Sequence, residues 1–247
     1  MISIIEEKED IINSSIKKGL EVEEEIEERM MGPSVQLSGH RSEIYCTKFS
    51  DCGTLLGSGG KDKDIFIWSV FSARFENSVV IKGHINSILD MCWSWDSEQI
   101  FSCGADRTVC IWDVQQATRI KKYRGHESFV NSIAVVRRGP EQLLSASDDC
   151  TVRMWDSRIR DQVHQIRRSY QITAVSFSHN SDGFFYAGVD NQIKFYNLRT
   201  NQDEYALIGH TDTITDIQLS HSGNFLLSNA MDHTVKYLLF SHPNTSF

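Results

Sequence analysis

Residues 83–113 read GHINSILDMCWSWDSEQIFSCGADRTVCIWD, and this pattern recurs along the chain. The Gly-His dipeptide that opens it stands at Gly39-His40, Gly83-His84, Gly125-His126 and Gly209-His210. The four histidines are 44, 42 and 84 residues apart, so the last interval spans two copies of the unit. A fixed period of this size indicates a fold in which one unit is repeated and each copy buries its apolar face against its neighbours.

Three further residue types keep their distance from the histidine. An aspartate follows it by 22 or 23 residues, a serine stands four residues before that aspartate, and in three copies a tryptophan stands six residues after it. The sets are His40, Ser58, Asp62 and Trp68; His84, Ser102, Asp106 and Trp112; His126, Ser145, Asp149 and Trp155; and His210, Ser228 and Asp232. Four residue types in register at several places indicate one repeated structural device.

The strands around one set predict how its side chains meet. Residues 99–103 and 108–113 are short β-rich runs, and Asp106 lies in the turn-forming stretch between them. An antiparallel pair would bring Ser102 next to Trp112, with the histidine entering from the preceding loop. We predict a chain of hydrogen bonds from indole to hydroxyl to imidazole to carboxylate. Serine, histidine and aspartate can also form a hydrolytic triad, but a catalytic set occurs once, so we interpret this repeated set as a structural brace.

The repeated pattern resembles the WD repeat over residues 34–240. Trp112-Asp113 and Trp155-Asp156 keep the dipeptide that names this family, whereas Trp68-Ser69 has lost the acid. The resemblance implies an all-β propeller of four-stranded blades, whose radial arrangement leaves only short, protected strand edges. We expect about five blades, compared with the seven that most members of the family carry.

The fourth and fifth copies depart from the pattern. In the fourth, Arg167-Arg168 stands in place of Gly-His, Tyr186 in place of serine and Tyr196-Asn197 in place of Trp-Asp, while Asp190 remains. Joint loss of serine and histidine fits a linked network, because half a network is worse than none. The fifth copy has Leu238 at the tryptophan position.

Three outcomes are open for the ring. The chain is a truncated product of a seven-repeat protein, or it closes with five blades, or it stays open with exposed strand edges. In the closed case residues 34–38 could supply the missing outer strand of the last blade. The domain boundaries expected are an acidic helical or disordered arm over residues 1–33, the propeller over 34–240 and a tail over 241–247.

Composition restricts the classes of function. The net charge is −8, and residues 1–33 hold ten acidic and four basic residues, which argues against direct nucleic-acid binding. In this arm Ile12, Ile16 and Leu20 have helical spacing and could dock on a partner, although a solvating tail is the simpler interpretation. The six cysteines share no metal-ligand spacing, so we expect reduced thiols and no metal. No phosphate-binding loop or His-Glu-x-x-His motif occurs, and we expect neither a cofactor nor enzymatic activity.

Two stretches are more specific than the general repeat, Arg137-Arg-Gly-Pro140 and Ser228-Asn-Ala-Met-Asp232. They resemble the WD-repeat proteins of the spliceosome. This implies a nuclear, non-catalytic scaffold for protein binding in pre-mRNA splicing. The implied partners are the large scaffold protein of the U-five small nuclear ribonucleoprotein and other spliceosome components, with only indirect or weak contact to RNA.

The basic residues of the third copy are the candidate contacts. Surface arginines of this sector could face an acidic protein surface, and we predict partner binding by Arg137, Arg138, Arg158 and Arg160. Trp155-Asp156-Ser157-Arg158 also resembles the Trp-Asp-x-Arg box by which some WD proteins dock on the adaptor of cullin-four ubiquitin ligases. A substrate receptor of such a ligase is therefore an alternative function, and a truncated product without independent function is a third possibility.

Overall fold

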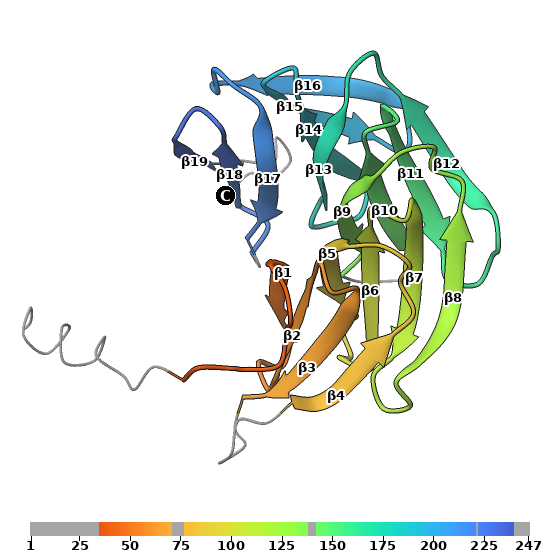
Figure 1. Ribbon diagram of the computed structural model, residues 1–247. Coiled ribbons are helices and arrows are strands. Elements are labelled where there is room, and N and C mark those ends of the chain that lie inside the picture. Colours follow the sequence, from red (N-terminus) through yellow and green to blue (C-terminus); the bar gives the residue numbers. More distant parts are fainter. Residues whose placement is uncertain (1–34, 71–76, 138–141, 221, 240–247) are drawn as a thin grey trace, which may run out of the picture. The chain divides into compact units, whose positions relative to one another are not determined.

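The computed structural model of the chain describes residues 35–70, 77–137, 142–220 and 222–239 (Figure 1). The chain divides into two compact units, Met1–Leu37 and Ser38–Phe247. The arm predicted over residues 1–33 and the tail predicted over 241–247 lie outside the described residues.

The second unit consists of antiparallel β-strands in five successive sheets. The first sheet contains β1 (Ile44–Phe49), β2 (Leu55–Gly60), β3 (Asp64–Ser69) and β4 (Asn77–Lys82); the second contains β5 (Ile88–Trp93), β6 (Gln99–Gly104), β7 (Thr108–Asp113) and β8 (Thr118–Arg124). The third contains β9 (Val130–Val135), β10 (Gln142–Ser147), β11 (Thr151–Asp156) and β12 (Gln162–Arg167); the fourth contains β13 (Ile172–Phe177), β14 (Gly183–Gly188), β15 (Gln192–Asn197) and β16 (Gln202–Ile208). The fifth contains β17 (Ile214–Leu219), β18 (Phe225–Ala230) and β19 (Val235–Leu239).

Each sheet is one blade, and we number the blades 1 to 5 along the chain. In every blade neighbouring strands follow one another in sequence, so the first strand lies at one edge and the last at the other. The first strands of consecutive blades pack on one another in the order β1, β5, β9, β13 and β17. The predicted all-β propeller with five blades is therefore confirmed, with blade 5 containing three strands in the described part of the chain.

The hairpin between the second and third strands of each blade has a repeated turn. The residue after the turn aspartate has a positive φ in all five blades, at Lys63, Arg107, Cys150, Asn191 and His233. In blade 2 the aspartate stabilises the turn through its first oxygen: Asp106 Oδ1 accepts hydrogen bonds from the backbone N–H and the hydroxyl of Thr108 at 3.2 and 2.7 Å. Asp149 and Asp232 make the same Asx-type bonds in blades 3 and 5, whereas Asp190 of blade 4 accepts instead from Lys194 Nζ at 2.7 Å.

The core is divided into four hydrophobic clusters, and each cluster fills one junction between consecutive blades. At the junction of blades 2 and 3, for example, Phe101 and Ile111 of blade 2 pack with Val130, Ile133 and Leu143 of blade 3. Burial against the neighbouring blade explains the apolar runs of these strands, since repeat proteins gain most of their core from such nearest-neighbour contacts.

The ring is open in the described part of the chain, because β17 and β1 do not form a junction of this kind. The side chains of Ile44 and Phe49 on β1 remain 48% and 62% exposed. Residues 35–38 belong to no strand, so the outer strand expected from residues 34–38 in a closed ring is not formed by them; Ser34 lies outside the described residues. Among the described residues, no helix is long and apolar enough to cross a membrane.

Candidate functional site

The four-residue set of blade 2 lies within hydrogen-bonding distance from end to end. The indole N–H of Trp112 donates to Ser102 Oγ at 2.6 Å, Ser102 Oγ lies 2.6 Å from His84 Nε2, and His84 Nδ1 lies 3.1 Å from Asp106 Oδ2. With the imidazole proton on Nδ1, the hydroxyl donates to Nε2 and the ring donates to the carboxylate, so every polar group has a partner. The whole set is buried at one end of the blade.

The other sets have the same geometry. The histidine-to-serine distances are 2.7, 2.7 and 2.8 Å in blades 1, 3 and 5, and the histidine-to-aspartate distances are 2.7, 2.8 and 2.8 Å. In blades 1 and 3 the tryptophan N–H donates to the serine at 2.8 Å. The structure therefore brings together all the residues predicted for these sets: His40, Ser58, Asp62, Trp68, His126, Ser145, Asp149, Trp155, His210, Ser228 and Asp232.

The glycine before the histidine has a steric reason. Gly83 has a φ of +151°, and a Cβ at this position would approach the Trp112 ring to 2.9 Å. A side chain would push the backbone off the indole and displace His84 from the serine. The Gly-His dipeptide is thus part of the same device, since glycine permits both the backbone conformation and the close approach.

The carboxylates of Asp106 and Asp149 are held in their charged form. Burial opposes the charge of Asp106, but the hydrogen bond from His84 outweighs it, and the pKa of Asp106 lies well below its ordinary value. Asp149 has its pKa lowered in the same way by His126 against the effect of burial. As charged groups, these two aspartates accept the hydrogen bond from the histidine, as the structural network requires.

Blade 4 has a replacement network that the sequence analysis missed. Arg168 Nε donates to the Tyr186 hydroxyl at 2.8 Å, and Arg168 Nη2 lies 2.7 and 2.9 Å from the two carboxylate oxygens of Asp203. The guanidinium also lies over the rings of Tyr186 and Tyr196, at 5.2 and 5.9 Å from their centroids. The blade is therefore braced by different chemistry, whereas the sequence analysis interpreted these substitutions as loss of the network. Asp203 had no signal in the repeat spacing.

The basic residues of blade 3 lie at both of its ends. Arg137 follows β9, and Arg158 and Arg160 follow β11, so the three leave the same end of the blade; Arg167 and Arg168 lie at the opposite end, because β12 is antiparallel to β11. Arg138 lies outside the described residues.

Two of the three described arginines have partners within the chain. Arg137 donates to the carbonyl oxygens of Leu219 and Ser220, both at 3.0 Å, and so joins blade 3 to blade 5. Arg158 forms a bidentate pair with the buried Asp156, at 2.9 and 2.6 Å, while its side chain stays 69% exposed. Arg160 is exposed and has no hydrogen bond to the described residues. Arg158 and Arg160 thus present charge outward, whereas Arg137 serves an internal link.

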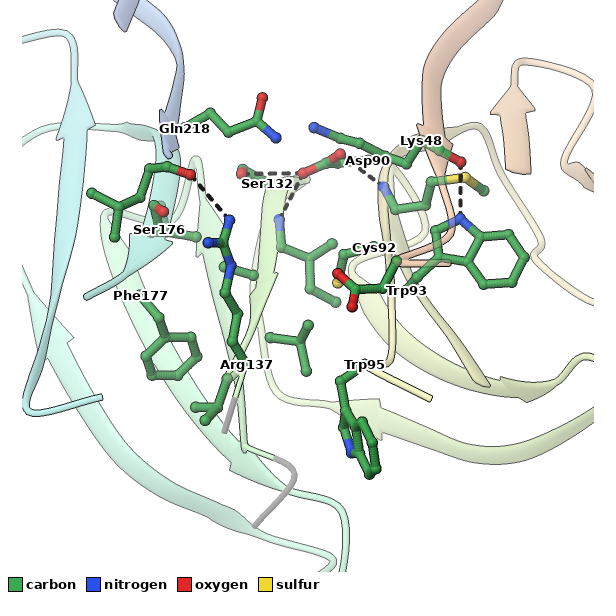
Figure 2. Close-up of a pocket in the computed structure, with 18 of the residues that line it drawn as sticks. Lys48, Asp90, Cys92, Trp93, Trp95, Ser132, Arg137, Ser176, Phe177 and Gln218 are labelled. Carbon is green, nitrogen blue, oxygen red and sulfur yellow. Dashed lines mark hydrogen bonds between the residues drawn. The ribbon is translucent and has the colours of Figure 1, made fainter. Parts of the chain in front are cut away.

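A cavity of about 560 Å³ lies among the first strands of all five blades (Figure 2). Asp90 projects into it from β5 and accepts hydrogen bonds from Ser132 Oγ at 3.2 Å and from the Ile133 N–H at 2.9 Å. Burial raises the pKa of Asp90 to about 6, Lys48 opposes this shift and Asp216 adds to it. The Trp95 side chain is 64% exposed near the end of the cavity where Arg137 lies. The described residues contain no group of three or more side chains that could hold a metal ion.

The chain belongs to the WD-repeat family, since residues 32–69, 75–113, 117–156 and 201–237 match the WD domain, G-beta repeat. Within this family, the chain is 40% identical to the U5 small nuclear ribonucleoprotein 40 kDa protein of Dictyostelium discoideum. The aligned region of 179 residues covers 72% of this chain and 50% of that protein. It is 38% identical over 183 residues to the pre-mRNA-splicing factor cwf17 of Schizosaccharomyces pombe, covering 74% of this chain and 54% of that one. The human U5 40 kDa protein is 40% identical over 196 residues, with 79% and 55% covered. The chain spans about half the length of these curated relatives.

The predicted family is thus confirmed. The fourth copy, residues 157–200, lies outside the four matched repeats. This copy nevertheless contributes to a regular four-stranded blade, in which the network of Arg168, Tyr186 and Asp203 stands in place of the serine and histidine network.

Proposed function

We propose that the chain is a non-catalytic scaffold for protein binding in pre-mRNA splicing, located in the nucleus. The observation that carries this proposal is the similarity, at 38–40% identity over most of the chain, to proteins named as a U5 particle subunit and a splicing factor. The proposed partner is the large scaffold protein of the U5 small nuclear ribonucleoprotein, with only indirect or weak contact to RNA.

The absence of catalysis is part of the proposal. The serine and histidine are linked to a carboxylate in four blades, and in three of these a tryptophan indole also donates to the serine. Ser102 is fully buried, so its hydroxyl has no access to a substrate. A repeated, enclosed network supports a brace that fixes the loops at the ends of the blades, and rigid loops are what a binding scaffold presents.

The proposed contact surface is the end of blade 3 where Arg158 and Arg160 emerge. Arg158 is held by Asp156 in one orientation, which lowers the entropy lost when its outer edge binds a carboxylate. Arg160 adds a second exposed charge two residues later. Such a pair suits an acidic protein surface, because guanidinium groups bind carboxylates in a bidentate manner.

Binding to the purified large U5 scaffold protein, measured by surface plasmon resonance, tests the proposal. We expect binding by the unaltered chain and weaker binding by the double variant Arg158→Glu/Arg160→Glu. Arg107→Glu is the matched control, since Arg107 is exposed in the turn at the opposite end of blade 2. If the folded, unaltered chain does not bind, the splicing assignment fails; equal binding by the double variant refutes only the proposed surface.

A further inference from the structure

Three of the four internal junctions bury the same positions of the first strand. The first, fourth and sixth residues of β5, β13 and β17 are apolar and at most 7% exposed: Ile88, Met91 and Trp93; Ile172, Val175 and Phe177; Ile214, Ile217 and Leu219. In β1 the same positions hold Ile44, Thr47 and Phe49, and all three are exposed. We call these three residues the blade-1 face. Among the described residues, no blade packs on this face as blades 1 to 4 pack on the blades that follow them.

The donating half is equally exposed on blade 5. In blades 2, 3 and 4 the third residue of the second strand is fully buried against the next blade: Phe101, Leu144 and Phe185. Its counterpart in blade 5, Leu227, is 47% exposed, and Val235 and Tyr237 on β19 are 63% and 61% exposed. We call these three residues the blade-5 face. A contiguous apolar surface of this kind marks an interaction site.

The polar groups of blade 5 repeat those that link the internal junctions. Thr173 of β13 donates to the Ala187 carbonyl at 3.2 Å within its blade and to the Ile214 carbonyl of the next blade. Thr215, at the same position of β17, makes the first bond, to Asn229 at 3.1 Å. Thr173 reaches the carbonyl of Ile214, the first residue of β17. The first residue of β1 is Ile44, so its carbonyl is the equivalent acceptor for Thr215.

A second polar correspondence concerns the aspartates. Asp90 Oδ1 accepts the Met91 N–H at 2.8 Å, and its Oδ2 accepts from the Ile133 N–H of the next blade. Asp216 repeats the first bond, to Ile217 at 2.8 Å, while its Oδ2 makes no hydrogen bond to the described residues. The position of Ile133 is occupied by Thr47 in β1. Blades 5 and 1 are therefore complementary in apolar surface and in hydrogen-bond groups.

We propose that a second copy of this chain occupies these surfaces, with blade 5 of one copy packed head to tail on blade 1 of the next. The occupant is argued from continuity with the established interface: the new junction would repeat the contacts of the four internal ones, and a copy of the chain carries both halves. Because the two halves are different surfaces, this association is heterologous, and each added copy leaves one half open at each end.

Sedimentation velocity over a wide concentration range tests the proposal, with one blocking variant for each face. Phe49→Glu places a charge in the blade-1 face and Tyr237→Glu in the blade-5 face, and both side chains are exposed, so the fold should tolerate them. Ile85→Glu is the matched control, since Ile85 is 69% exposed in the loop before β5 and lies in neither face. Circular dichroism melts check that each variant is folded.

The expected pattern is specific to a head-to-tail interface. The unaltered chain and Ile85→Glu associate with rising concentration, each blocking variant alone is monomeric, and an equal mixture of the two forms a dimer but nothing larger. In that mixture the intact blade-5 face of one variant meets the intact blade-1 face of the other. A monomeric unaltered chain, as in a ring that closes on itself, overturns the proposal, and so does a self-associating blocking variant or a mixture that stays monomeric.

Discussion

Replacing Ser102 with alanine tests the brace at its central atom. Ser102 Oγ is fully buried and is the partner of both the Trp112 indole N–H and His84 Nε2, each at 2.6 Å. Ser102→Ala leaves both groups buried without a partner, at about 1–3 kcal/mol each. Since the hydroxyl is small, the cavity adds little, and we expect a total loss of about 2–5 kcal/mol in the free energy of unfolding. For a chain of this size, the midpoint temperature should fall by roughly 2–4 °C for each kcal/mol.

The assay is urea unfolding followed by far-ultraviolet circular dichroism, extended to a double-mutant cycle. Trp112→Phe removes the indole N–H but keeps most of the ring, so one orphaned group of Ser102→Ala disappears in the double variant. The double variant should therefore lose less stability than the two single variants together, by about 1–2 kcal/mol. Ser157→Ala is the control, because no hydrogen bond of its hydroxyl occurs among the described residues, and it should stay within about 0.5 kcal/mol. A Ser102→Ala loss as small as that of the control, or strict additivity in the cycle, would refute the relay.

Three other outcomes are expected. Trp112→Ala should lower the free energy of unfolding by about 3–5 kcal/mol in the same urea assay, because it leaves a cavity at a blade junction; a loss under about 1 kcal/mol would contradict this burial. Arg168→Ala should destabilise by about 1–3 kcal/mol, comparable to loss of a brace residue, because it strips Tyr186 and Asp203 of a shared partner; an unchanged melting curve would show that blade 4 is not braced by this arginine. Asp90, with its pKa raised from 3.8 to about 6, keeps a proton in the folded state that the unfolded chain releases, so its contribution to stability should decline as the pH rises from about 4 to about 6. Asp90→Asn should remove this decline in a series of melts against pH, and a persistent slope would assign it to other groups.

Spacing predicted the blades because a brace needs fixed residue types at fixed distances along the chain. Ser102 and Trp112 lie on the adjacent strands β6 and β7, Asp106 lies in the turn between them and His84 in the loop before β5, so their spacing follows from strand length and turn type. The blade-4 network follows no such rule. Arg168 reaches Asp203 on the outer strand, a pairing that replaces a histidine-to-turn bond and that is not repeated in another blade among the described residues. A network that occurs once leaves no periodic signal.

The internal link made by Arg137 could not be predicted from the sequence for a different reason. Arg137 was grouped with Arg158 and Arg160 by proximity in sequence, but its guanidinium binds backbone carbonyls of Leu219 and Ser220, more than eighty residues away. Backbone acceptors carry no residue identity, so such a contact cannot be inferred from composition or spacing. Only the three-dimensional position of β17 separates an arginine that links blades from those that face solvent.

At the open junction, β1 keeps the apolar residues of the repeat although no blade covers them among the described residues. Ile44 and Phe49 are apolar because β1 follows the same strand pattern as β5 and β13, in which those positions are covered by the preceding blade. The pattern therefore encodes a receiving surface on every blade, including the first, whether or not a preceding blade is present. Exposed apolar surfaces of this kind are normally covered in stable proteins. Because Ile44 and Phe49 carry no charge to prevent pairing, the surface that the repeat creates on blade 1 remains competent for the same packing that holds the other blades together.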